Sequence, residues 1–249
     1  MMSIKTAILT IDDAPSVDMR GKLDFLSTLS IPAIWFCQGN YLEQRPDLVL
    51  NAIGKGYFIG NHTYDHPHFS DLTLEEGYEQ ISRTDDLIED LYRQAGVPRP
   101  IKAFRFPYGD KGGLKWGEVL QPYSLAGAER KAALQAYLKK LGYTPAPSEN
   151  INYQYYFRAG LHVDNDWYWT YDILDWSIYS DHPFEGIDSI EKVLARMDED
   201  DPENGKGLNR PESSEIILTH DHQPTTQHFQ AIINRLLEKG IQFISPVGK

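Results

Sequence analysis

The sequence predicts an α/β protein built around a parallel sheet, closed as a barrel or left open. Short runs with the composition of β-strands alternate with segments of helical spacing over most of the 249 residues. A chain of this length can bury one core without dividing, because strand–helix barrels commonly reach about 250 residues. Hydrophobic residues make up 41% of the chain and aromatic residues 12%, which excludes the composition of a disordered protein. We therefore expect one domain over residues 1–249.

Each predicted element rests on its own pattern. Apolar runs with the composition of strands occur at Thr6–Ile11, Ala33–Cys37, Tyr57–Gly60, Ala103–Phe106, Ile216–Thr219 and Gln242–Ile244. Helical spacing of apolar residues occurs at Leu23–Leu29, Asp47–Ile53, Leu74–Gln94, Glu129–Leu141, Ile187–Met197 and Gln227–Lys239. Because strands and helices alternate, the strands should run parallel.

Three segments interrupt this alternation. Asp110–Gly127 is rich in glycine, lysine and aromatic residues and is predicted to be a loop. Tyr143–Trp176 holds many tyrosine, tryptophan and asparagine residues without a clean period, which predicts irregular strands and surface that lines a cleft. Residues 110–171 thus form an irregular, aromatic-rich insertion. Asp198–Ser214 contains a run of acidic residues and is predicted to be an exposed connection.

Composition also limits the partners and the compartment. The formal net charge is −12 and no basic cluster occurs, which argues against nucleic acid and against membrane insertion. No apolar run approaches the about twenty residues that span a bilayer. Cys37 is the only cysteine, which excludes an internal disulfide, and its apolar neighbours predict a core position. The first ten residues lack a secretory signal, which predicts a cytoplasmic protein, or a secreted one if a signal was removed before Met1. The sequence does not determine the oligomeric state.

Two polar clusters follow predicted strands, where a barrel carries its active site. Asp12 and Asp13 come directly after the first strand, and adjacent carboxylates stay ionised only near a cation or strong donors. Taken alone, this pair also fits a solvated turn. His62 and His66 follow the third strand, and a single helical turn would place both imidazoles on one face. Such pairs also occur in helices that bind nothing. With Asp13, however, they make a three-ligand set that leaves room for water, the pattern of a catalytic zinc site.

Five motifs, in order, resemble those of the polysaccharide deacetylases, the NodB-homology type of carbohydrate esterase family 4. They are Asp12-Asp13, His62-Thr-Tyr-Asp-His66, Arg105-Phe-Pro107-Tyr108-Gly109, Asp172-Ile-Leu-Asp175-Trp176 and Leu218-Thr-His220-Asp221. The resemblance extends from residue 10 to residue 221 and so covers nearly the whole chain. Five ordered matches favour the family, although each motif alone has an ordinary structural explanation.

The resemblance implies a distorted (β/α) barrel of seven or eight strands. It also implies one divalent metal bound by Asp13, His62 and His66. Zinc is the expected metal, with cobalt, manganese or nickel as alternatives.

The resemblance assigns the proton transfers as well. Asp12 would be the general base, held by Arg105, and His220 the general acid, supported by Asp175. Amide hydrolysis needs both, because a base must accept the proton of water and an acid must protonate the leaving amine. The backbone N–H of Tyr108 would face the oxyanion.

Two further residues are implied to form the apolar wall for the acetyl methyl group, namely Trp176 and Leu218. Either could equally be a core residue. One departure from the family pattern concerns Ala14, which stands where glycine usually follows the paired aspartates. If the backbone needs a positive φ at that position, alanine is strained there.

The sequence therefore predicts a metal-dependent hydrolase that removes an acetyl group from an N-acetylated sugar or oligosaccharide. One alternative is a cyclic imide or ureide amidohydrolase on the same scaffold, although such relatives tend to lack the paired aspartates. Another is a catalytically silent carbohydrate-binding protein, although no ligand, base or acid is missing. A cytoplasmic enzyme would act on soluble N-acetyl sugars, short oligosaccharides or a precursor, and aromatic residues within Tyr153–Trp176 could stack on sugar rings.

Overall fold

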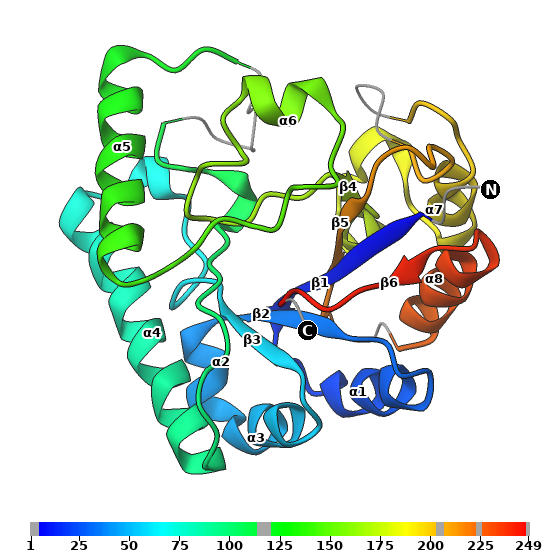
Figure 1. Ribbon diagram of the computed structural model, residues 1–249, viewed down its shortest axis with the longest axis horizontal. Coiled ribbons are helices and arrows are strands. Elements are labelled where there is room, and N and C mark those ends of the chain that lie inside the picture. The colour runs from blue at the N-terminus through cyan, green and yellow to red at the C-terminus, as the bar shows by residue number, and fades with distance from the viewer. Residues whose placement is uncertain (1–4, 114–120, 203–206, 223–225, 248–249) are drawn as a thin grey trace. The chain divides into compact units, whose positions relative to one another are not determined.

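Strands and helices alternate along the chain, as the sequence predicts (Figure 1). The structure is a computed structural model that describes residues 5–113, 121–202, 207–222 and 226–247. The chain forms two compact units. The first consists of Met1–Ile34, Glu149–Tyr153 and Trp169–Lys249, and the second of Trp35–Ser148 and Gln154–Tyr168. Each unit therefore combines segments that are distant in sequence.

The sheet of the first unit is parallel. Its strands are β1 (Thr6–Ala14), β4 (Tyr171–Asp172), β5 (Glu215–His220) and β6 (Gln242–Phe243). Strand β5 pairs with both β1 and β4, while β6 pairs with the start of β1. Nearly every residue of β1 and β5 is buried, which explains why these strands appear in the sequence as continuous apolar runs. The register sets Asp12 opposite His220, so two predicted catalytic residues end neighbouring strands.

Helices cover this sheet with apolar stripes. They are α1 (Met19–Thr28), α7 (Ile190–Met197) and α8 (Thr226–Glu238), with the 3-10 helices η4 (Asp175–Tyr179) and η5 (Phe184–Gly186). Helix α8 contacts both α1 and α7. Its buried residues Phe229, Ile232, Ile233 and Leu236 recur at helical spacing, so one face of the helix is apolar.

The second unit continues the alternation. Its elements are β2 (Ala33–Cys37, begun in the first unit), α2 (Gly39–Gln44), α3 (Pro46–Gly54), β3 (Phe58–Asn61), η1 (Phe69–Asp71), α4 (Leu74–Ala95), η2 (Pro107–Gly109), α5 (Leu125–Lys140) and α6 (Gln154–Arg158). Helix α4 contacts α2, α3 and α5 and organises the unit. It begins with a capping box between Thr73 and Glu76 and ends at Gly96, whose φ of 71° suits glycine.

The core of the second unit lies under the loops that follow β3. A buried cluster joins Phe69, Ile81, Phe104, Phe106, Leu134, Leu138 and Tyr143. The rings of Phe104 and Phe106 meet edge to face with centroids 4.7 Å apart. Because Tyr143 lies beyond α5, this cluster attaches the insertion to the strand and loop segments of the unit.

A buried lysine also fixes the insertion. Lys111 Nζ lies 2.7 Å from Asp164 and 2.9 Å from Asp166, and all three side chains are buried. The charges of the two aspartates outweigh burial and raise the pKa of Lys111, so it stays charged. Asp110–Lys111 is therefore tied to the far end of the insertion.

Most predicted strands and helices are confirmed, but α6 was not predicted, and α1 and α7 begin at Met19 and Ile190 and not at the predicted residues. The strand predicted at Ala103–Phe106 is wrong for most of its length, because only Phe104 forms an isolated bridge, with Asn61. Helix α2 was not predicted, since it is short and lacks a helical apolar pattern. Helix α5 begins at Leu125, where Ser124 caps it, so the predicted loop ends earlier than Gly127. Residues 114–120 of that loop and 203–206 of the acidic connection lie outside the described residues.

The aromatic residues of the insertion mainly serve packing. The buried ones are Tyr143, Tyr153, Tyr156, Trp167, Tyr168 and Tyr171. Trp169 and Trp176 are only partly exposed. Phe157 is 42% exposed and Tyr155 is partly exposed, so the segment keeps some accessible rings, and their stacking on sugar stays a prediction. Cys37 is buried, as predicted, and none of the helices that the structure describes is long and apolar enough to span a bilayer.

Packing around β3 generates a stability prediction. A Cβ added at Gly60 would lie 2.5 Å from the Phe36 ring, whereas one added at Gly54 would meet nothing within 4 Å. We expect Gly60→Ala to lower the free energy of unfolding by about 1–3 kcal/mol through overpacking. The control Gly54→Ala should leave it unchanged or raise it by up to about 1 kcal/mol. Urea unfolding measures both, and equal stability of the two variants would contradict the packing described.

Candidate functional site

Strand β1 ends in the two carboxylates that the sequence predicts as base and metal ligand. Asp12 is buried and lies opposite His220. Asp13 is partly exposed and has a φ of 63°. Ala14 is not among the described residues with positive φ. The strain considered at Ala14 is therefore absent, since Asp13 takes the left-handed conformation, which aspartate tolerates better than alanine.

Asp175 binds His220 through both the side chain and the backbone. One carboxylate oxygen of Asp175 lies 2.8 Å from His220 Nδ1. The other oxygen accepts hydrogen bonds from the His220 backbone N–H at 2.8 Å and from the Thr219 hydroxyl at 2.7 Å. Asp175 is 5% exposed, so these donors replace the water around its charge. The residues predicted as the general acid and its support are thus in direct contact.

The protonation of His220 follows from this contact. Burial by itself lowers the pKa of His220, but the charge and hydrogen bond of Asp175 outweigh burial, and Asp13 and Asp172 add to them. The pKa of His220 rises from 6.5 to about 10. Burial opposes the charge of Asp175, yet the charge and hydrogen bonds of His220 hold the pKa of Asp175 below its usual value. At neutral pH the two therefore form an imidazolium–carboxylate pair that can donate a proton.

Asp172 lies between the two residues predicted as the apolar wall. Leu218 pairs with Asp172 in the sheet and is buried. The indole N–H of Trp176 donates to the Asp172 carboxylate at 3.3 Å, and Trp176 is partly exposed. Burial raises the pKa of Asp172. Leu218 is thus an interior residue, whereas Trp176 keeps part of its surface accessible, and their roles toward an acetyl group stay predictions.

A buried ion pair anchors the segment that follows β1. Asp221 accepts hydrogen bonds from the Ser16 backbone N–H at 2.6 Å and from the Ser16 hydroxyl at 2.9 Å. The carboxylate of Asp221 also lies 2.6 Å from Lys22 Nζ, and both side chains are fully buried. The Asp221 N–H donates to the Asp12 carbonyl at 2.8 Å. These bonds fix the backbone on both sides of the paired aspartates.

His222 places a second imidazole beside Asp13. The rings of His220 and His222 stack with centroids 5.2 Å apart, and His222 Nε2 lies 3.6 Å from Asp13 Oδ2. Burial and the charge of His220 lower the pKa of His222. By distance alone, these three side chains could hold a metal ion. In this set His220 would bind through Nε2, because its Nδ1 faces Asp175, so the set is an alternative to Asp13, His62 and His66.

In the second unit, His62 and His66 bring their imidazoles together. Their ring centroids lie 4.9 Å apart. His62 Nδ1 lies 2.9 Å from the Arg105 carbonyl, which can only accept, so Nδ1 carries the hydrogen and Nε2 is the basic nitrogen. This is the tautomer and the type of support that histidine ligands of zinc require.

The loop that carries these histidines is not helical. Thr63 and His66 have φ values of 69° and 63°, so the single helical turn expected here is wrong. Side-chain oxygens replace helical hydrogen bonds: Asn61 Oδ1 accepts from the Thr63 N–H at 2.9 Å, and Thr63 Oγ1 accepts from the His66 N–H at 3.2 Å. The two imidazoles approach because the chain folds back between them.

Arg105 and Tyr108 border this loop. Arg105 is buried, its Nε donates to the Trp167 carbonyl at 2.9 Å, and its guanidinium lies 4.4 Å from the centroid of the Phe36 ring. Tyr108 has a φ of 56° and stacks on His68 with centroids 3.9 Å apart. His68 is thus partly covered by Tyr108. The backbone N–H of Tyr108 as an oxyanion donor stays a prediction.

The predicted metal triad draws on both units. Asp13 belongs to the first unit, and His62 and His66 belong to the second. Their joint binding of one ion therefore stays a prediction, as does the support of Asp12 by Arg105.

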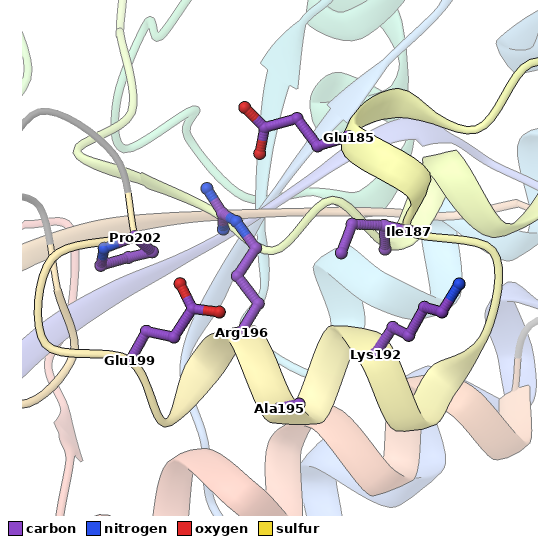
Figure 2. A pocket seen from close by; sticks show the side chains of 7 residues that line it. All are labelled: Glu185, Ile187, Lys192, Ala195, Arg196, Glu199 and Pro202. Carbon is purple, nitrogen blue, oxygen red and sulfur yellow. The ribbon is translucent and has the colours of Figure 1, made fainter.

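A pocket of about 250 Å³ in the first unit contains none of the predicted site residues. Figure 2 shows its lining, which consists of Glu185, Ile187, Lys192, Ala195, Arg196, Glu199 and Pro202. Two carboxylates and two cationic side chains face it, so its charge favours neither anions nor cations. Arg196 also donates to the Asp172 carbonyl at 2.8 Å, which gives this residue a structural role.

Comparison with known families decides the relationship. A family model described as polysaccharide deacetylase matches residues 2–145, more than half of the chain. The chain belongs to the polysaccharide deacetylase family. Polysaccharide deacetylases of this type depend on a metal.

Individual relatives agree with this membership. Over 111 residues the chain is 36% identical to a peptidoglycan-N-acetylglucosamine deacetylase of Bacillus cereus, in an alignment that covers 43% of this chain and 38% of the relative. The match thus spans well under half the length of that protein. A family 4 carbohydrate esterase from Streptomyces lividans, solved in complex with acetate, superposes with a TM-score of 0.60 at 25% identity and covers 97% of this chain and 94% of its own.

The fold is shared even where catalysis is not. A family 4 pseudoenzyme from Bacillus anthracis has a TM-score of 0.61 at 17% identity, covering 98% of this chain and 65% of its own, so this likeness concerns the fold alone. The predicted fold class, an α/β fold of the distorted-barrel deacetylase type with a parallel sheet, is confirmed by these similarities. Because a pseudoenzyme shares this fold, the fold alone does not establish activity, which depends on the site residues.

Sequence reasoning missed the side chains that hold the site in place. Lys22 carried a signal, because it lies within the buried stripe of α1 together with Met19, Leu23 and Leu26. A lysine at an apolar position of a helix predicts a buried carboxylate partner. Ser16 gave no comparable signal.

The Asp175–His220 pair predicts how the pKa of His220 and the stability of the fold depend on Asp175. In chelator-treated protein, NMR titration should give a His220 pKa near 10, and Asp175→Asn should lower this pKa, because the largest charge that opposes burial is removed and only Asp13 and Asp172 remain. Because the folded-state pKa of His220 is raised, the pair stabilises the fold fully below pH 6.5 and loses this contribution as pH rises toward 10. The stability difference between wild type and Asp175→Asn should therefore shrink above pH 7. A His220 pKa in Asp175→Asn equal to that of wild type would contradict the assignment of Asp175 as its partner.

Proposed function

We propose that the protein is a metal-dependent hydrolase that removes the acetyl group from an N-acetylated sugar or oligosaccharide. The observation that carries the proposal is the contact between Asp175 and His220 at the end of β5, opposite Asp12 at the end of β1. It supplies a protonated acid beside a candidate base, and amide cleavage needs both. Family membership and the similarity to a peptidoglycan-N-acetylglucosamine deacetylase support the substrate class.

Asp13, His62 and His66 are the proposed metal ligands. One carboxylate and two imidazoles suit zinc, and the hydrogen bond from His62 Nδ1 to a carbonyl leaves Nε2 as the ligand atom. Cobalt, manganese or nickel are the alternatives that the same donor set accepts. A bound divalent ion would supply Lewis acidity toward the acetyl carbonyl and toward water.

The proton transfers fall to residues of the first unit. Asp12 accepts a proton from the attacking water, whose oxygen forms a bond to the acetyl carbon. The bond between that carbon and the sugar nitrogen breaks, and the His220 imidazolium gives its proton to the nitrogen. Acetate and a free amine result. Asp175 keeps His220 protonated between turnovers.

The remaining predicted residues position these groups. Arg105 holds the Asp12 carboxylate, the Tyr108 backbone N–H faces the developing oxyanion, and Trp176 with Leu218 forms the methyl wall. One preorganised donor toward an oxyanion contributes about 3 kcal/mol. Since Leu218 is buried in the sheet, Trp176 is the better candidate for direct contact with the methyl group.

Both alternatives have specific consequences. A silent carbohydrate-binding protein would need no proton donor. The buried Asp175 carboxylate, however, stabilises the charged form of His220, which is what a proton donor requires. A cyclic imide or ureide amidohydrolase would open rings without releasing acetate. The cytoplasmic location and the preference for short soluble substrates stay part of this proposal.

Metal binding can be tested without activity. We expect purified wild-type protein to hold one zinc ion, and His62→Ala or His66→Ala to bind it at least about tenfold more weakly, because each loses one of three ligands. His222→Ala serves as the control, since it removes the imidazole beside Asp13 that belongs to the competing set. Chelator competition gives the affinities. A larger loss in His222→Ala than in His62→Ala would move the metal to the Asp13, His220 and His222 set.

Activity is tested on a panel of substrates. Zinc-loaded protein should release acetate from N-acetylglucosamine or its oligomers of two to six sugars, without opening cyclic ureides. Asp12→Asn should lower the rate about 10²- to 10⁴-fold while zinc affinity stays unchanged, because a base is lost but no ligand. Ring opening without acetate release would establish the cyclic-amide alternative, and binding of oligomers without either reaction would establish the silent binder.

A further inference from the structure

A buried polar network lies behind the loop that carries His62 and His66. Asn61 is fully buried, and its amide nitrogen donates to the Tyr143 hydroxyl at 2.7 Å and to the Ile81 carbonyl at 2.9 Å. The Tyr143 hydroxyl donates in turn to Asp85 at 2.8 Å. All of these residues belong to the second unit, and Tyr143 lies at the start of the aromatic segment that the sequence marks as irregular.

The charge of Asp85 starts this network. Arg99 lies 2.5 Å and Lys102 2.7 Å from the Asp85 carboxylate, which is buried with its partners around it. Burial alone would raise the pKa of Asp85, but the two cations and Tyr143 outweigh it and hold the pKa below its ordinary value. Asp85 is therefore ionised at neutral pH and acts only as an acceptor.

Because Asp85 can only accept, it determines which group donates in the hydrogen bonds from Tyr143 to Asp85 and from Asn61 to Tyr143. Because the Asp85 carboxylate can only accept, the Tyr143 hydroxyl must donate to it, and the Tyr143 oxygen is left to accept from Asn61. Asn61 must then present its NH₂ group to Tyr143 and Ile81, which turns its oxygen the other way. That oxygen accepts the Thr63 N–H at 2.9 Å. The Ile81 carbonyl and the Thr63 N–H require this same orientation of the amide, so the hydrogen bond from Asn61 to Tyr143 reinforces it.

The orientation of Asn61 matters because Thr63 is where the histidine loop turns. Thr63 has a φ of 69°, which a β-branched residue adopts only when its surroundings hold it there. Its hydroxyl accepts the backbone N–H of His66. The same Asn61 backbone joins the loop to its other neighbour, because its carbonyl accepts the Arg105 N–H at 3.0 Å. The Arg105 carbonyl then fixes the tautomer of His62.

We propose that Asp85, Tyr143 and Asn61 form a positioning network that sets the conformation of the His62–His66 loop and thereby the metal affinity of the two histidines. The proposal rests on the proposed function in one respect only, namely that these histidines bind a metal. It gives a role to Tyr143, the first residue of the irregular segment Tyr143–Trp176: its hydroxyl supports the loop that carries His62 and His66. None of the three residues is among the proposed metal ligands or catalytic residues, so each acts through Thr63 and the histidines.

Tyr143→Phe tests the network, because it removes one hydroxyl and keeps the ring in the aromatic core. Asp85 keeps Arg99 and Lys102, and Asn61 keeps Ile81, so the variant should fold. The matched control is Tyr156→Phe, which removes a buried hydroxyl from the same unit, one that donates only to the Tyr168 carbonyl at 3.3 Å. Circular dichroism and urea unfolding verify that both variants are folded.

Two readouts separate positioning from general stability. In chelator-treated protein, the Thr63 amide should exchange with solvent about tenfold faster in Tyr143→Phe than in wild type or Tyr156→Phe, since opening of Asn61 exposes it. With zinc, the dissociation constant should rise about tenfold or more in Tyr143→Phe and stay within about twofold in the control.

The outcomes distinguish this inference from the proposed function. If wild type binds zinc and Tyr143→Phe changes neither readout, the positioning network is refuted and the proposed function stands. If both tyrosine variants weaken zinc equally, the effect is one of stability and the network is refuted. If wild type binds no zinc, the proposed function fails, and faster exchange of Thr63 in Tyr143→Phe alone still supports the control of loop conformation, while unchanged exchange overturns it.

Discussion

A carboxylate keeps its charge inside a protein only where donors replace the water it has lost, and Asp175 shows what this requires. Its three donors come from two consecutive residues, Thr219 and His220, at the end of β5. The sheet register therefore controls the electrostatics: a shift of β5 by one residue would turn the imidazole away and leave the charge uncompensated. The position of Asp12 opposite His220 follows from the same register.

The second unit meets a related requirement with groups that are mostly neutral. Asn61, Thr63 and the Arg105 carbonyl determine the shape of the histidine loop through hydrogen bonds, and Tyr143 connects Asn61 to the charged Asp85. The Asp85 carboxylate thus determines which way the Tyr143 hydroxyl donates, and the neutral Tyr143 and Asn61 side chains connect it to the histidine loop.

The sequence was sufficient for most strands, most helices and the order of the chemical motifs, because apolar periodicity and motif spacing are local signals. It did not predict that Asp13, Thr63 and His66 take positive φ, since these conformations depend on partners elsewhere in the chain. Tyr143 could not be linked to Asn61 by any spacing rule, because 82 residues separate them. The strand expected at residues 103–106 is wrong although its composition is that of a strand, because only Phe104 pairs, as an isolated bridge to Asn61.

The ion pair between Lys22 and Asp221 has a consequence for how the chain is made. Its two members are 199 positions apart, so at about 5–20 residues per second a ribosome finishes Asp221 about 10–40 s after Lys22. During that interval the ammonium group of α1 stays hydrated and Ser16 lacks its acceptor. The turn after β1 can therefore reach its final form only late in translation, and closing so long a loop makes this region a slow, high-contact-order part of folding. A chain released early would carry its paired aspartates on an unanchored turn.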